Sequence, residues 1–198
     1  MERSLTQIRD VDLKILSELD DRDLLNYCKT HKYGNELCNN EDFWRNRLQA
    51  KFPGAEKYKS PKRTWKNYYL KIIYYLNKYE SLMEAMLAAV RRNEKDIVQF
   101  FILKGGPRWT QYDWNSGLYR AAQGGHVDLM KFFIQKGADE LRSSLYAAAL
   151  GGHKDAIDYL ISQRTDLNET FWLEGLRGAQ KARNKDLMGF FGDKIYYK

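Results

Sequence analysis

The sequence predicts an all-α protein in which pairs of helices stack along the chain. A unit of about 30 residues is written four times, apolar residues recur at helical spacing, and no segment shows the strict alternation typical of strands. We expect a small N-terminal helical head at residues 1–52, a basic aromatic bridging helix at 53–80, and a solenoid of about four helix pairs at 81–198.

The repeated unit is clearest in the middle of the C-terminal half. The run Ala121–Asp139 is echoed at Ala148–Leu160, and weaker copies lie at Ala89–Phe101 and Ala179–Phe191. A single unit of this size cannot bury its apolar face alone, so neighbouring units must stack. Because stacked units form an extended surface and not a reaction pocket, the repeats predict a binding function and not a catalytic one.

Within each unit the spacing predicts two antiparallel helices joined by a tight turn. Leu118, Ala121 and Ala122 form a short apolar stripe, and the pair Gly124-Gly125 ends this helix by permitting a positive φ. A second stripe follows, formed by Val127, Leu129, Met130, Phe133 and Ile134. The two stripes would pack against each other and against the neighbouring units.

Short motifs in the two middle units resemble those of the ankyrin repeat family. The counterparts of the family's Thr-Pro-Leu-His-x-Ala start are Ser116–Ala121 and Ser143–Ala148. The counterparts of its Gly-His turn are Gly125-His126 and Gly152-His153. The resemblance covers about residues 82–198. It implies a non-enzymatic surface that binds a protein target, with connections between units that project as fingers.

The connection between the first two units carries three large aromatic side chains and an arginine. These residue types dominate the hot spots of protein interfaces. A projecting finger cannot hide all of them, so we expect this loop to contribute to partner binding. The candidate partner-binding residues are Arg108, Trp109, Tyr112 and Trp114.

The N-terminal head is predicted from three short helical segments. Apolar residues recur at helical spacing in Asp10–Leu19, and the acids that begin Asp20–Cys28 suit a helix N-terminus. Asn39 and Asn40 can cap a third helix that carries Phe43, Trp44 and Leu48.

The head resembles an F-box, the module through which substrate receptors dock on the adaptor of cullin-type ubiquitin ligases. The matching runs are Lys14–Asp20, Asp23–Leu25, Cys28 and Phe43–Arg45, and Gln7-Ile8 stands where the family has Leu-Pro. The resemblance implies adaptor docking by residues of the first two helices, namely Leu13, Leu16, Leu24 and Leu25. An F-box-like head before short ankyrin repeats is similar to proteins of large DNA viruses of amoebae.

The two cysteines and the absence of an apolar targeting segment predict an intracellular protein, in the host cytoplasm if it is viral. Cys28 and Cys38 are too few for a disulfide framework, which agrees with a reducing environment. With His31 they would supply only three zinc ligands, whereas a structural zinc site needs four. We therefore expect Cys28 in the core and no metal, and no stretch is apolar enough to span a membrane.

Positive charge is concentrated in the bridging segment. The chain has a net charge of +7, and residues 45–78 hold ten Lys or Arg against a single acid, Glu56. Bases interleaved with aromatic side chains are typical of a nucleic-acid surface. However, Trp65, Tyr68, Tyr69, Ile72, Ile73 and Leu76 recur at helical spacing. This periodicity favours aromatic residues in a core and lysines on its solvated face.

Candidate catalytic groups are sparse. His126 and His153 each precede an acid by two residues, but as repeated turn residues they are expected to hydrogen-bond neighbouring backbone. The chain lacks the phosphate-binding, nucleotide-binding and hydrolase motifs, so we predict no enzyme activity and no cofactor.

The functional hypothesis is a non-enzymatic interaction module, which binds a protein on its repeats and presents it to a ubiquitin ligase through its head. Two alternatives remain open. The first is an ankyrin scaffold whose head is only a structural cap. The second is a nucleic-acid-binding protein that uses the basic segment 45–78.

Overall fold

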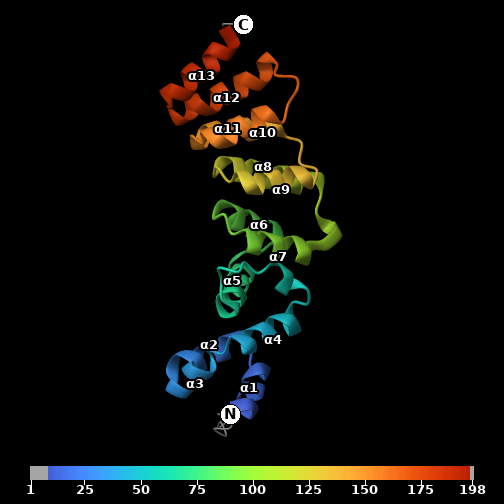
Figure 1. Cartoon of the computed structure of the whole chain (residues 1–198), viewed down its shortest axis with the longest axis vertical. Coiled ribbons are helices and arrows are strands. Elements are labelled where there is room, and N and C mark those ends of the chain that lie inside the picture. Colours follow the sequence, from blue (N-terminus) through green and yellow to red (C-terminus); the bar gives the residue numbers. More distant parts are fainter. Residues whose placement is uncertain (1–8, 197–198) are drawn as a thin grey trace. The chain divides into compact units, whose positions relative to one another are not determined.

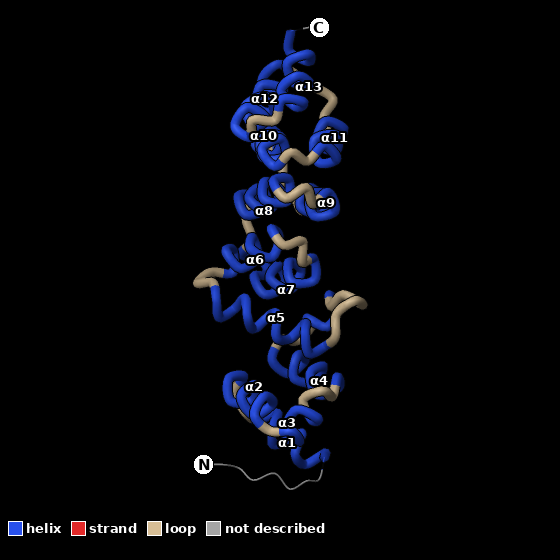
Figure 2. The backbone as a smooth tube through the Cα atoms, turned by 90° about the vertical axis from the view of Figure 1, so that its left-hand side faces the viewer, coloured by secondary structure: helices blue, strands red, loops and turns tan. Residues whose placement is uncertain are grey.

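The computed structural model describes residues 9–196, and every regular element in this part of the chain is a helix. It contains thirteen α-helices, two short 3₁₀ helices and no strand (Figures 1 and 2). The chain divides into two compact units, Met1–Asn77 and Lys78–Lys198. The all-α prediction is confirmed. Gln7-Ile8, the counterpart of the F-box Leu-Pro, lies outside the described residues.

The N-terminal unit contains the head and also the helix predicted as a bridge. Its elements are α1 (Arg9–Glu18), α2 (Asp21–Thr30), α3 (Lys32–Leu37), α4 (Glu41–Lys51), η1 (Ala55–Tyr58) and α5 (Trp65–Lys78). The short helix α3 was not predicted. Three side chains cap the predicted helix starts: Asp20 accepts from the backbone N–H of Asp23, Asn40 from that of Phe43, and Thr64 from that of Asn67.

The core of the N-terminal unit is built from aromatic side chains of α4 and α5. Trp44, Tyr68 and Tyr69 are fully buried, and the ring centroids of Trp44 and Tyr69 lie 5.5 Å apart. The Tyr68 hydroxyl donates to the carbonyl of Ala55, 3.2 Å away. The aromatic stripe of α5 is therefore a core stripe of the N-terminal unit.

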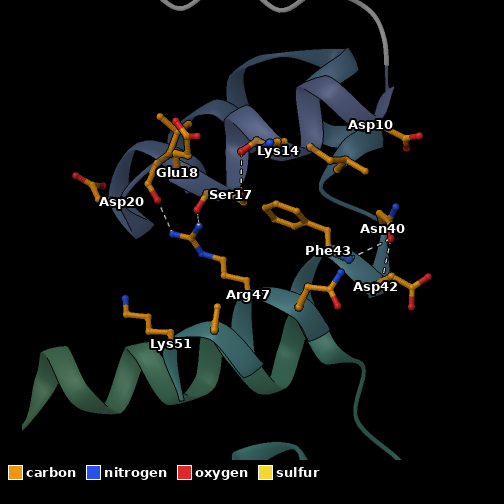
Figure 3. A pocket seen from close by; sticks show the side chains of 14 residues that line it. Asp10, Lys14, Ser17, Glu18, Asp20, Asn40, Asp42, Phe43, Arg47 and Lys51 are labelled. Carbon is orange, nitrogen blue, oxygen red and sulfur yellow. Dashed lines mark hydrogen bonds between the residues drawn. The ribbon is translucent and has the colours of Figure 1, made fainter. Parts of the chain in front are cut away.

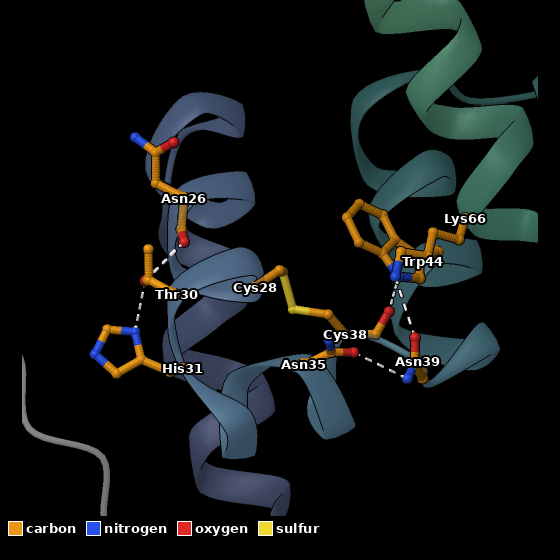
Figure 4. The surroundings of a disulfide bond; sticks show 9 residues. All are labelled: Asn26, Cys28, Thr30, His31, Asn35, Cys38, Asn39, Trp44 and Lys66. Carbon is orange, nitrogen blue, oxygen red and sulfur yellow. Dashed lines mark hydrogen bonds between the residues drawn. A yellow bond between two sulfur atoms is a disulfide. The ribbon is translucent and has the colours of Figure 1, made fainter.

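Cys28 and Cys38 are joined by a disulfide, which corrects the prediction of two reduced thiols (Figure 4). The short helix α3 turns the chain back after α2, so the two Cα atoms come within 5.8 Å of each other. Trp44 fixes this turn because its indole Nε1–H donates to the carbonyl of Cys38 at 2.7 Å. The count of cysteines gave no sign of their proximity, and the pairing also excludes the zinc alternative with His31.

The second unit contains four helix pairs. They are α6 (Leu82–Arg91) with α7 (Lys95–Gly105), α8 (Gln111–Gln123) with α9 (Val127–Gln135), α10 (Leu141–Gly151) with α11 (Lys154–Ser162), and α12 (Glu169–Ala182) with α13 (Lys185–Tyr196). The first helices of the pairs, α6, α8, α10 and α12, pack side by side in this order. We call them the inner helices, and the four predicted units are confirmed.

The same backbone turn ends the inner helix of every unit. The fourth residue after the shared alanine has a positive φ: 55° at Asn93, 70° at Gly125, 75° at Gly152 and 56° at Arg183. Glycine takes this conformation without steric cost, whereas Asn93 and Arg183 take it only in the two outer units. The shared turn explains why the weaker copies keep the same fold despite losing the glycines.

A small residue lies beneath the main aromatic anchor in two of the pairs. A Cβ atom added to Gly117 would lie 2.4 Å from the ring of Phe133, and one added to Gly175 would lie 2.3 Å from the ring of Phe191. These glycines occupy equivalent positions four residues before the shared alanine. The close approach lets the second helix of each pair pack directly against its inner helix.

The turn histidines contact the preceding unit, and His126 contacts neighbouring backbone as the sequence predicted. His126 Nε2 lies 3.3 Å from the carbonyl oxygen of Arg91, at the end of the preceding inner helix. A Cβ atom on Gly125 would lie 2.6 Å from the ring of His153. Each ring therefore fills the turn region of the neighbouring unit and links consecutive units.

Candidate functional site

Several positions of the inner helices stay half-buried or exposed in every unit, and one of these rows carries large side chains. The residue two positions before the shared alanine is half-buried or exposed in all four units, and these residues are Leu87, Tyr119, Tyr146 and Arg177. Three large side chains and one cation thus follow each other from unit to unit. The equal spacing of these residues from the repeated alanine is visible in the sequence, but the aromatic residues of the connecting loop give a stronger signal for a binding site.

A pocket of about 520 Å³ opens on this face, and three inner helices contribute to it. It is lined by Met83, Leu87, Tyr112, Asn115, Ser116, Tyr119, Arg120, Glu140 and Ser143. Apolar side chains of α6 and tyrosines of α8 form most of its surface. Arg120 and Glu140 provide opposite charges, so the pocket combines apolar surface with a few placed polar groups, as binding pockets do.

Asn115 fixes the wall of the pocket between α8 and α10. Its side-chain Oδ1 accepts from the backbone N–H of Asp139 at 2.8 Å and from that of Glu140 at 3.2 Å. Its Nδ2 donates to the carboxylate of Asp139 at 3.0 Å. Hydrogen bonds from Asn115 and Gln111 to the Asp139 carboxylate lower its pKa.

The predicted aromatic finger is not a projecting loop: Arg108 ends a 3₁₀ turn, η2 (Gly106–Arg108), and Tyr112 and Trp114 already lie in α8. The Trp109 indole Nε1–H donates to the carbonyl of Ile102 at 2.9 Å, and its ring lies 5.9 Å from that of Trp114. The ring of Trp114 lies 6.5 Å from that of Phe133. Both tryptophans therefore hold the connection against the repeat.

Tyr112 differs from the two tryptophans because 76% of its surface is exposed. It lies in the first turn of α8 and lines the pocket. Arg108 is also exposed, and its Nε donates to the carbonyl of Gly105 at 3.3 Å. Of the four predicted partner-binding residues, Tyr112 and Arg108 have side chains that a partner can reach.

The four leucines predicted for adaptor docking divide between core and surface. Leu16 is 1% exposed and Leu24 is fully buried, so both belong to the core of the head. Leu13 and Leu25 are partly exposed. Adaptor docking by the head stays a prediction, and it now rests on Leu13 and Leu25.

The basic segment 45–78 offers few free aromatic faces. Tyr68, Tyr69 and Tyr75 are buried, and the half-buried ring of Trp65 lies beneath two cations, with Arg45 Cζ at 5.5 Å and Lys59 Nζ at 4.9 Å. Bases stack on exposed aromatic rings in single-stranded nucleic-acid sites. The burial of these rings favours a solvated basic face over a nucleic-acid reader.

Two other kinds of site, a metal centre and a membrane-spanning helix, have no candidate within residues 9–196. Within this range no cluster of three or more His, Cys, Asp or Glu side chains is placed to hold a metal ion. The helices in the same range are all too short or too polar to span a membrane.

Comparisons with known proteins identify the repeat region. A search of curated proteins finds no match for this chain. The comparisons give no support to the F-box or viral resemblance, so both stay predictions.

A family model described as ankyrin repeats, in three copies, matches residues 85–170. This range runs from α6 to the start of α12 and includes every residue of the pocket except Met83. Residues 85–170 are therefore an ankyrin repeat region, of the kind that mediates protein–protein interaction.

Proposed function

We propose that the protein binds a partner protein on the open face of its inner helices, with the pocket around Tyr112 and Tyr119 as the central contact. The observation that carries this proposal is the pocket itself, because three consecutive inner helices supply its lining. Tyrosine and arginine at such a place give large contact area and hydrogen bonds at a low entropic cost. Asn115 supports the proposal by holding the pocket wall in place before a partner arrives.

Replacing Tyr112 by alanine should weaken partner binding without unfolding the repeats. The side chain is 76% exposed, so its removal leaves no cavity in the core. We expect a loss of about 2 kcal/mol in binding free energy, roughly a thirty-fold rise in Kd. The measurement is a titration against a partner isolated by affinity purification, with circular dichroism to check folding.

Tyr196→Ala is the matched control for Tyr112→Ala. Tyr196 is 75% exposed but lies in α13, away from the pocket lining. Its replacement should leave Kd unchanged. Equal effects of the two substitutions on Kd, or no effect of Tyr112→Ala, would show that the partner does not bind at this pocket.

A second candidate function is that of a substrate receptor for a cullin-type ubiquitin ligase. The partly exposed Leu25 on α2 supports this candidate, because an apolar side chain at the head surface is available to an adaptor. Purified ligase adaptor should then bind the full chain at low micromolar Kd, and Leu25→Arg should abolish this binding. If the unsubstituted chain shows no adaptor binding, the head is only a cap and the scaffold alternative holds.

Duplex DNA should bind the protein weakly and without sequence preference. The net charge of +7 supplies phosphate contacts, but of the aromatic rings in segment 45–78 only that of Tyr74 is exposed. We expect a Kd of order 10⁻⁴–10⁻⁶ M that rises steeply with salt, as in counterion release. Electrophoretic mobility shifts at two salt concentrations measure this. Tight, sequence-selective binding at physiological salt would instead favour the nucleic-acid alternative.

A further inference from the structure

A groove of about 840 Å³ runs between α1 and α4 in the N-terminal unit, and we call it the α1–α4 groove (Figure 3). Its apolar surface comes from Leu13 and Leu19 on one side and from Phe43 and Ala50 on the other. Figure 3 shows the ring of Phe43 between the two helices. The groove lies wholly outside the ankyrin repeat region, so neither the family match nor the proposed repeat site accounts for it.

Carboxylates surround the α1–α4 groove although the whole chain carries a net charge of +7. The four acids in its lining are Asp10, Glu18, Asp20 and Asp42, and the three cations are Lys14, Arg47 and Lys51. Two of these cations, Arg47 and Lys51, form ion pairs with Asp21 beneath the groove. With Asp21 included, five acids stand against three cations, so this surface is negative although the protein is basic overall.

Hydrogen bonds from Arg47 hold the two sides of the groove together before any partner binds. Its guanidinium donates to the carbonyl of Ser17 at 3.0 Å, to that of Leu19 at 2.6 Å and to the carboxylate of Asp21 at 2.9 Å. These bonds connect the end of α1 and the start of α2 to the middle of α4. Only 8% of the Arg47 side chain is exposed, and its positive charge is paired with the Asp21 carboxylate.

We propose that the α1–α4 groove binds a basic amphipathic helix of a partner protein. The two walls are formed by helices of 10 and 11 residues, and their apolar side chains offer a surface onto which the apolar face of a third helix can pack. Lysines or arginines that flank this apolar face would then meet Asp10, Asp42 and Glu18 at the rim. The site is independent of the repeat face, and it would let the chain hold a second protein while its repeats are occupied.

The probe is a fluorescein-labelled peptide of about 14 residues, or four helical turns, with leucines on one face and lysines on the other. Its Kd for the full-length protein is measured by fluorescence anisotropy in about 0.1 M salt, where the Debye length is about 10 Å. A matched peptide with every lysine replaced by glutamate tests the charge requirement. We expect micromolar binding of the lysine peptide, with helix induced on binding, and at least tenfold weaker binding of the glutamate peptide.

A double substitution at the rim, Asp10→Asn with Asp42→Asn, should weaken binding of the lysine peptide at least fivefold. The matched control is Asp155→Asn with Asp186→Asn. All four acids lie in the first turn of a helix, so both double substitutions remove the same favourable interaction with a helix N-terminus. The control pair lies in the repeats and should leave Kd unchanged.

Ala50→Trp tests the apolar part of the α1–α4 groove. Ala50 is exposed in the groove, so a larger side chain can occupy the space without entering the core. We expect this substitution to abolish binding of the lysine peptide while the circular dichroism spectrum is retained. Three results would overturn the proposal: no binding of the lysine peptide, equal binding of both peptides, or equal effects of the rim and control substitutions.

Discussion

Gly178→Ala should destabilise the repeat array strongly, although alanine is the better helix former. A Cβ atom at this position would lie 2.3 Å from the carbonyl oxygen of Tyr146 and 2.9 Å from the Cβ of Ala149. The first of these neighbours is backbone of α10, so relief requires α10 and α12 to move apart. We expect a loss of about 2 kcal/mol in the free energy of unfolding, as for other overpacked positions.

The same substitution at Gly189 is the control for Gly178→Ala. Gly189 lies inside α13, and a Cβ atom there meets nothing within 4 Å. Gly189→Ala should therefore stabilise the protein, by about 0.5–1 kcal/mol, because only helix propensity changes. Denaturant unfolding followed by circular dichroism measures both variants. Shifts of the same sign would show that α10 and α12 are not packed at this distance.

Arg47→Ala should be the most damaging single substitution of a charged residue in the head. The guanidinium connects α4 to Ser17, Leu19 and Asp21, and its removal leaves two carbonyls and a carboxylate with fewer donors. We expect a loss of about 3 kcal/mol, as when one partner of a buried ion pair is removed. Arg45→Ala, on the same helix, is the control. Arg45 is exposed above Trp65, so its loss should cost less than about 1 kcal/mol.

The effect of Arg47→Ala should depend on pH through Asp21. Burial disfavours the Asp21 carboxylate, but hydrogen bonds from Lys51, Tyr69 and Arg47 outweigh burial and lower its pKa. A lowered pKa gives stability that is present above the ordinary value of 3.8 and is lost as the pH falls through the folded-state pKa. The difference between the variant and the unsubstituted protein should therefore shrink below about pH 4. A difference that grows toward acid pH would contradict this role of Asp21.

The repeat architecture could be predicted because it depends on contacts between near neighbours in the sequence. The shared alanine, the turn after it and the anchor twelve residues later, such as Phe133, recur in every unit and specify the same helix pair. Even the degenerate turns at Asn93 and Arg183 keep the positive φ that the glycines of the middle units adopt.

The candidate sites were harder to predict because they depend on contacts between segments. The prediction that the connection cannot hide all of its aromatic side chains did not say which of them is exposed, because nothing in the sequence indicates that Trp109 reaches back to the carbonyl of Ile102. The Cys28–Cys38 pair likewise depends on the short helix α3, which is too short to show a periodic pattern. The disulfide and the Trp109 contact both depend on spatial neighbours that the residue types alone do not specify.

Site-specific photo-crosslinking tests most directly the claim that the inner face binds a partner protein. A photoreactive amino acid is placed at Tyr112 or Tyr119 on this face, and at Lys131 or Asp158, which are exposed on the second helices of their pairs. After exposure to a partner isolated with the unsubstituted chain, crosslinked product should form from positions 112 and 119 and not from 131 or 158. Crosslinking from 131 and 158, with none from 112 or 119, would contradict the assignment of the inner face as the binding surface.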